Sequence, residues 1–258
     1  MDPSSMSIFG IPGYIILWAA TLVSLACFGR RIVLLARLLK QARPENRFTH
    51  IGKRVRYVLT YVFGQNRLLN EPLIGAAHVV IFWGFVLFAA TFAWNQLRWL
   101  FPFVSIPYAD EVGVVRMLLE AFAILILVAI TIATARRLFF PPPHLQKSGD
   151  ANFILALIGS LMCTFLLGME FRIGAGGFEE ASLNPFDRLL ARNGLGLYTS
   201  STSAWQLYSW MFFAHQTIVL FFLAYLPHSK HMHLLASPFS VFLGNVNRNQ
   251  RVVISVGG

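Results

Sequence analysis

The histidines are the residues of this chain that are best suited to chemistry. The stretch "YLPHSKHMHLLASPF" carries His228, His231 and His233 just after a long apolar run, His215 lies inside that run, and His78 lies inside an earlier one. An ionisable side chain within a membrane-spanning helix is costly, so its presence marks a candidate functional site. Imidazole is also the commonest metal ligand in proteins. These histidines therefore either hold a metal or, after the apolar run, form a solvated basic tail.

Helical spacing separates these histidines. His215 and His233 are 18 residues apart, which is about five turns, so on one continuous helix both point in the same direction. His228 and His231 point elsewhere on such a helix. Haem iron can take one axial imidazole from each of two facing helices, and His78 is expected at the same inner depth as His233. The spacing therefore predicts a haem between His78 and His233, and the alternative is a hydrogen-bonded or pore-lining histidine.

The composition places these histidines in a membrane protein. Hydrophobic residues make up 56% of the chain and charged residues 12%, which is about half the charged share of a soluble domain. Apolar blocks of about 20 residues are long enough to cross a bilayer as helices. The chain therefore predicts an all-α integral membrane fold, a bundle of five transmembrane helices within residues 1–240, followed by a cytoplasmic tail, 241–258. The five helices are expected at about 11–36, 72–97, 111–135, 151–171 and 203–227.

The positive charges are distributed unevenly along the chain. The net charge is +10, and 16 of the 21 Lys and Arg residues lie in three segments, 30–67, 136–150 and 227–258. Positively charged loops tend to stay on the cytoplasmic side of a membrane. This distribution predicts an amino terminus outside and a carboxyl terminus in the cytoplasm. Because membrane topology explains the charge, we expect no nucleic acid among the partners.

The basic segments 30–48 and 51–69 have apolar residues at helical spacing among their arginines. Amphipathic helices of this kind lie along a membrane surface. They anchor the chain to lipid headgroups, or they form a docking surface for a cytoplasmic partner.

The chain contains two cysteines, Cys27 and Cys163, and both lie inside predicted helices. An iron–sulfur cluster is usually held by four thiolates, and two cysteines make no disulfide framework. Any iron–sulfur cluster must therefore belong to a partner.

Two charged residues, Arg116 and Glu120, lie four positions apart in the third predicted helix. Residues at this spacing are neighbours on a helix and can neutralise each other within the membrane. A role of Glu120 in proton transfer is the alternative. The second outer loop, 172–202, is the longest on its side and could lie across the mouth of the bundle as a lid.

The end of the last predicted helix carries a family resemblance. Pro227, Ser229, Lys230, His233 and Pro238 match the pattern Pro-x-Ser-basic-x-x-His-x-x-x-x-Pro, and here the chain resembles the cytochrome b (gamma) subunit of respiratory nitrate reductase. The stretch "RRLFFPPPHLQKSGDANFIL" also has a similar counterpart in that family, whose members have five helices and an outside amino terminus. The resemblance covers most of the chain.

This resemblance implies which histidines bind haem. The family has two histidines ten residues apart on its second helix and two more on its last helix, which together serve two haems. His78, His215 and His233 stand at three of these positions, and Phe88 stands at the fourth. The resemblance therefore implies one haem b held by His78 and His233, and it leaves a second haem at His215 without its opposite ligand. His215 then has an unusually ligated haem, or a hydrogen bond in the core, or no partner.

A further stretch, "YVFGQNRLLNEPLIGAAHVVIFWGFVLF", is similar to the membrane portion of fused proteins in which a cytochrome b domain precedes a cytoplasmic iron–sulfur reductase of the heterodisulfide-reductase type. This resemblance implies a multi-pass protein of the bacterial or archaeal cytoplasmic (inner) membrane. It implies electron transfer between a cytoplasmic iron–sulfur or flavoprotein partner and menaquinone or another quinone, within a quinone-linked oxidoreductase complex. The alternative is a haem-free membrane anchor subunit that docks a soluble complex.

Overall fold

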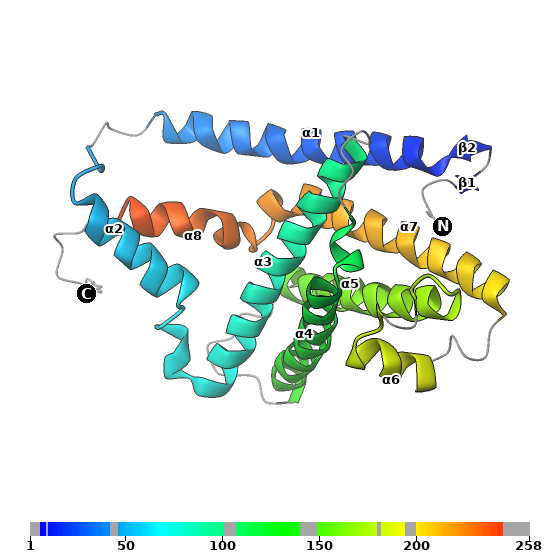
Figure 1. Ribbon diagram of the computed structural model, residues 1–258. Coiled ribbons are helices and arrows are strands. Elements are labelled where there is room, and N and C mark those ends of the chain that lie inside the picture. The colour runs from blue at the N-terminus through cyan, green and yellow to red at the C-terminus, as the bar shows by residue number, and fades with distance from the viewer. Residues whose placement is uncertain are drawn as a thin grey trace.

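The computed structural model describes residues 6–8, 10–41, 46–100, 107–139, 149–179, 182–193 and 200–244, and for 98–100 and 190–193 it describes the backbone alone. These residues are mostly helical (Figure 1). The long helices are α1 (Gly13–Leu39), α3 (Pro72–Leu100), α4 (Gly113–Phe139), α5 (Gly149–Gly174) and α7 (Ser201–Tyr225). The shorter elements are β1 (Ser7–Ile8), β2 (Ile11–Pro12), α2 (Ile51–Tyr57), η2 (Val58–Phe63), η3 (Leu68–Asn70), η4 (Ala109–Glu111), α6 (Pro185–Asn193), η7 (Leu226–His228) and α8 (Met232–Phe242).

Within the described residues, four helical segments are long and apolar enough to cross a membrane. They are Pro72–Leu97, Gly113–Phe139, Gly149–Gly174 and Ser201–His228. These segments overlap four of the five ranges expected to span the membrane. Helix α1 overlaps the first range but is not among the four. The chain thus has the character of an all-α, multi-pass membrane protein, and the fifth span and the orientation remain predictions.

The two ends of α7 follow from local chemistry. Ser200 precedes the helix, and its hydroxyl accepts a hydrogen bond from a backbone N–H of the first turn, as a preferred N-cap residue does. At the other end, Pro227 has no backbone N–H to continue the helix, so α7 ends at Tyr225 and η7 leads into α8. The comparison of His215 with His233 on one continuous helix therefore does not apply. They lie on two different helices, α7 and α8.

The long helices pack in pairs around one core. Helices α5 and α7 pack side by side, as do α3 and α4, and α1 lies along α7 (Figure 1). Helix α3 approaches α4 closely at Gly84, where a Cβ atom would lie 2.5 Å from Ile126 Cδ1. Helix α1 is tied to α7 by Ser24, whose hydroxyl donates to the carbonyl of Leu220 at 2.6 Å. The buried core consists of Ala123, Ile126, Ile130, Leu161, Met162, Phe222 and Leu226.

Helix α6 fastens the end of α4 that is predicted to face outward, called the outer end below. Arg116 donates to Asp187 Oδ2 at 3.0 Å and to the carbonyl of Ser182 at 2.6 Å, and the side chains of the ion pair are almost completely buried. Glu120 accepts a hydrogen bond from the amide of Asn184 at 2.8 Å. The expected Arg116–Glu120 pair is therefore wrong. Asp187 takes the place of Glu120 because α6 folds back against α4.

Candidate functional site

His78 of α3 and His233 of α8 lie together at the opposite, inner end of the bundle. Their ring centres are 6.4 Å apart, and the ring planes are inclined by 39°. An imidazole nitrogen lies about 2 Å from a bound transition metal, and the ring centre lies about 1 Å farther out, so two imidazoles on opposite sides of one ion have centres about 6 Å apart. The separation of these two rings therefore fits one metal ion between them.

Both rings are held through the same nitrogen atom. His78 Nδ1 lies 2.8 Å from Oε1 of Gln65, and His233 Nδ1 lies 2.8 Å from the carbonyl oxygen of Lys230. Amide and carbonyl oxygens only accept hydrogen bonds, so Nδ1 carries the proton in both rings and Nε2 keeps its lone pair. Metal-binding histidines are typically oriented in this way by a partner on their other ring nitrogen. Both rings are thus prepared to donate Nε2 to a metal.

His231 is a third imidazole at the inner end. Its ring centre lies 5.5 Å from that of His233, and its Nδ1 is buried without a hydrogen-bond partner within the described part of the chain. Burial, and then the nearby His233, lower the pKa of His231 to about 4, so the ring is neutral at physiological pH. Helical spacing alone placed this residue away from the site. The signal that could have found it is Pro227, which breaks the helix before it.

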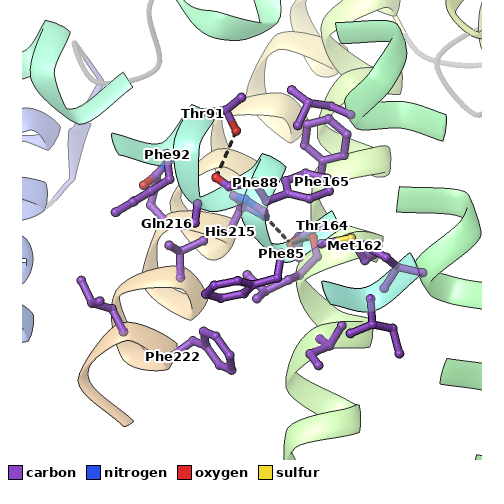
Figure 2. Close-up of a pocket in the computed structure, with 18 of the residues that line it drawn as sticks. Phe85, Phe88, Thr91, Phe92, Met162, Thr164, Phe165, His215, Gln216 and Phe222 are labelled. Atoms are coloured by element: carbon purple, nitrogen blue, oxygen red, sulfur yellow. Dashed lines mark hydrogen bonds between the residues drawn. The ribbon is translucent and has the colours of Figure 1, made fainter. Parts of the chain in front are cut away.

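His215 of α7 lies midway along the bundle (Figure 2). Its Nδ1 lies 3.0 Å from the hydroxyl of Thr164, and that hydroxyl is also within hydrogen-bond distance of the carbonyls of Ser160 at 2.8 Å and Leu161 at 3.1 Å. The ring centre of Phe165 lies 6.2 Å from that of His215, and the ring centre of Phe88 lies 5.3 Å from that of Phe165. His215 thus has a hydroxyl and aromatic rings as neighbours.

One cavity of about 760 Å³ connects these histidines, and it is lined by residues of α3, α4, α5, α7 and α8. Its volume is within the range of about 300–1,000 Å³ that is usual for cofactor and ligand pockets. Its wall is largely apolar and includes the aromatic rings of Phe82, Phe85, Phe88, Phe92, Phe165, Phe212 and Phe222. Figure 2 shows five of these rings, those of Phe85, Phe88, Phe92, Phe165 and Phe222. Arg137 and Lys230 line it near the inner histidines. The cavity therefore suits a largely apolar ligand that carries negative charge at one edge.

The outer end of the cavity is more polar than its middle. Asn95, Gln96, Asp110, Arg172 and Tyr208 contribute to its lining there. Arg172 forms an ion pair with Asp110 and also lies 3.8 Å from a carboxylate oxygen of Glu111, so one guanidinium faces two carboxylates at this end.

The pair of imidazoles matches the donor set that an iron porphyrin takes from a protein. Within the described ranges, no group of three or more His, Cys, Asp and Glu side chains is placed to hold a metal ion. Cys27 and Cys163 are both free and exposed. A porphyrin supplies the equatorial ligands of its iron, so the protein needs to supply only the axial ones. The His78 and His233 pair fits this need.

The chain is similar to two curated oxidoreductases. It is 28% identical to the probable iron-sulfur-binding oxidoreductase FadF of Bacillus subtilis (strain 168) over 211 residues, which cover 81% of this chain and 29% of FadF. It is 26% identical to the EtfAB:quinone oxidoreductase of Syntrophomonas wolfei over 202 residues, which cover 72% of this chain and 27% of that protein. The chain is related to oxidoreductases.

The chain spans less than a third of the length of these curated relatives. No family model matches it, and no solved structure matches it. The relatives are named for iron–sulfur binding and for a quinone, and neither name singles out a cytochrome b family. The similarity therefore supports a link to electron transfer.

Proposed function

We propose that this chain is a haem b membrane subunit that carries electrons between a cytoplasmic iron–sulfur or flavoprotein partner and the membrane quinone pool. In this proposal α1 is the fifth membrane span. Its 27 residues are enough for a hydrocarbon core of about 30 Å. The amino terminus lies outside and the carboxyl terminus in the cytoplasm, so the His78 end of the cavity faces the cytoplasmic partner.

The pair of imidazoles at the inner end carries this proposal. His78 and His233 have centres 6.4 Å apart, and each donates its Nδ1 proton to an oxygen. They would be the two axial ligands. A haem with both axial positions taken by imidazole exchanges single electrons and has no open position for a substrate. The chain itself holds the two rings in register and surrounds the site with apolar side chains.

Basic side chains near the pair fit the acidic edge of a haem. Arg137 and Lys230 line the cavity at its inner end, and haem propionates are carboxylates that such cations neutralise. The same side chains would keep the propionates directed toward the cytoplasmic surface, away from the apolar middle of the bundle. The polarity of the cavity thus supports one orientation of the group.

The outer half of the cavity supports a quinone site. It combines the aromatic walls of Phe92 and Phe212 with the polar groups of Asn95, Gln96 and Tyr208. An apolar pocket with a few polar groups that fix orientation is typical of small-molecule sites. A quinone has a flat apolar ring and carbonyl oxygens that accept hydrogen bonds, so it matches this lining. One of the curated relatives is named as a quinone oxidoreductase.

An iron–sulfur or flavin centre would come from a partner or from protein outside this chain. The two cysteines are exposed, on α1 and α5, and the curated relatives are more than three times as long as the region they share with this chain. One of those relatives is named for iron–sulfur binding. The basic segments next to the inner end supply a surface for an acidic redox partner.

The test is the colour of the purified chain. We expect a reduced-minus-oxidised spectrum of the b type and about one haem per chain by pyridine haemochrome. We also expect that a quinone such as menadione oxidises the reduced chain. A chain that remains colourless after expression with sufficient haem supply would contradict the proposal and would leave the haem-free anchor.

A further inference from the structure

Gln65 is a buried residue in an unusual backbone conformation beside His78. It follows η2, its side chain is only 3% exposed, and its φ angle is 50°. Positive φ angles are uncommon for residues other than glycine. A buried amide costs free energy unless it is hydrogen-bonded, and here Oε1 accepts from His78 Nδ1 at 2.8 Å. The contact with His78 therefore satisfies the Oε1 atom of this buried amide.

The surrounding chain holds Gln65 against the first turns of α3. Its carbonyl accepts a hydrogen bond from Leu68 N at 2.9 Å, at the start of η3. Gly75 of α3 lies so close to η3 that a Cβ atom would lie 2.2 Å from the carbonyl oxygen of Leu68. His78 is one turn farther along α3 than Gly75. The absence of a side chain at Gly75 therefore lets the Gln65 segment approach the histidine.

The hydrogen bond determines which nitrogen of His78 can act as a ligand. Because Oε1 only accepts, the His78 proton must be on Nδ1, and Nε2 keeps its lone pair. A hydrogen bond of this kind also makes the imidazole a stronger donor to the metal. His233 receives the same support from the backbone carbonyl of Lys230, which no substitution removes. Of the two hydrogen bonds that hold the histidines, only the one from His78 to Gln65 can therefore be changed by a side-chain substitution at its acceptor.

We propose that Gln65 is a positioning residue that fixes the tautomer and orientation of His78 and thereby tunes the reduction potential of the haem held there. This inference rests on the proposed function. Hydrogen bonding to an axial ligand is one of the ways in which a protein sets haem potential. A stronger acceptor at position 65 increases the electron density on the imidazole and stabilises the ferric state. Loss of the acceptor has the opposite effect.

The experiment compares midpoint potentials of the full chain with three substitutions at position 65. Gln65→Glu introduces a carboxylate acceptor, and we expect a lower potential with full haem content. Gln65→Leu removes the acceptor, and Gln65→Gly removes it while tolerating the positive φ angle. We expect both of these variants to have a higher potential than wild type. Agreement between the Leu and Gly variants would separate the hydrogen bond from the backbone strain.

The matched control is Gln206, an exposed glutamine near the start of α7. Gln206→Glu and Gln206→Leu should have the wild-type potential. The inference is overturned if Gln65→Glu keeps its haem and has the wild-type potential. If the Leu and Gly variants lose haem, the midpoint potential of the Glu variant still tests the inference, because this variant keeps an acceptor for His78. A wild-type chain without haem would instead contradict the proposed function. The haem content therefore tests the proposed function, and the midpoint potential tests the role of Gln65.

Discussion

The two ends of the cavity use their polar side chains in different ways. At the outer end, Arg172 pairs with Asp110, and on the adjacent helix Arg116 pairs with Asp187. At the inner end, His78 and His233 each use Nδ1 for a hydrogen bond to the protein, and within the described residues no hydrogen bond engages Nε2. The outer ion pairs hold the helices together, although Glu120 Oε1 and Asp187 Oδ1 are buried there without a hydrogen-bond partner among the described residues. At the inner end, the nitrogen atoms that keep a lone pair are available to a ligand.

His215 has different neighbours from the two inner histidines, and its role as a ligand of a second haem remains a prediction. It lines the same cavity as His78 and His233, and its Nδ1 is fixed by Thr164 in a similar way. Its aromatic neighbour Phe165 packs against Phe88, at the position where the cytochrome b family would have a further histidine. What lies across from a histidine thus decides whether it can hold a metal from both sides.

Removing either inner imidazole should have the largest effect. We expect His78→Ala and His233→Ala to lose essentially all haem, because a single remaining axial ligand leaves one face of the iron without a protein donor. His215→Ala should keep the wild-type haem content. Pyridine haemochrome per purified chain measures all three.

The control for these variants is His228→Ala, since His228 is an exposed histidine beside the same site. It should keep its haem. Loss of haem in His215→Ala but not in His233→Ala would contradict the contrast between the two regions and would move the site to the middle of the bundle.

A second imidazole near His215 should give the middle of the cavity the same pair of ligands that the inner end has. Phe88→His shortens an aromatic ring of the cavity wall (Figure 2) and adds a nitrogen donor beside Phe165 and His215. We expect the haem content to rise from about one toward two per chain, with a second set of b-type spectral features. Phe92→His, one turn farther along the same wall, should leave the ratio at one. If Phe88→His still binds one haem per chain, then lack of space, and not the missing ligand, prevents a second haem from binding here.

Features that depend on local patterns could be predicted from the sequence. Apolar blocks of spanning length predicted the four apolar helices, and matching depth in the membrane associated His78 with His233, which the structure brings together. Contacts between distant segments left no periodic signal. Arg116 pairs with Asp187, 71 residues away, and Gln65 reaches His78 only because Gly75 permits a close approach. His231 was missed because the directions of the histidines were compared on a continuous helix, which Pro227 interrupts.

Breaking the outer ion pair should affect stability but not haem binding. Arg116→Met leaves the fully buried Asp187 without its cation, and removal of one partner of a buried pair typically costs about 3–5 kcal/mol. Thermal unfolding in detergent should show a clear loss of stability with an unchanged haem content before unfolding. The exposed Arg188 supplies the control, since Arg188→Met should be close to neutral.

The double variant Arg116→Met with Asp187→Leu sharpens this test. It removes both charges, so it should recover much of the lost stability. If Arg116→Met loses haem while the folded fraction is unchanged, the outer end takes part in cofactor binding and the division between the two ends is wrong.

The smallest effect is expected where the inner end is held together by close backbone packing. Gly75→Ala places a methyl group 2.2 Å from the carbonyl oxygen of Leu68, and overpacking of this kind typically costs about 1–3 kcal/mol. Because η3 must move away from α3, the Gln65 acceptor should move with it, so the haem potential should shift in the same direction as in Gln65→Leu. Gly29→Ala is the matched control, since a Cβ atom there meets nothing within 4 Å. A destabilised Gly75→Ala chain with the wild-type potential would show that the packing of η3 supports the fold but not the orientation of His78.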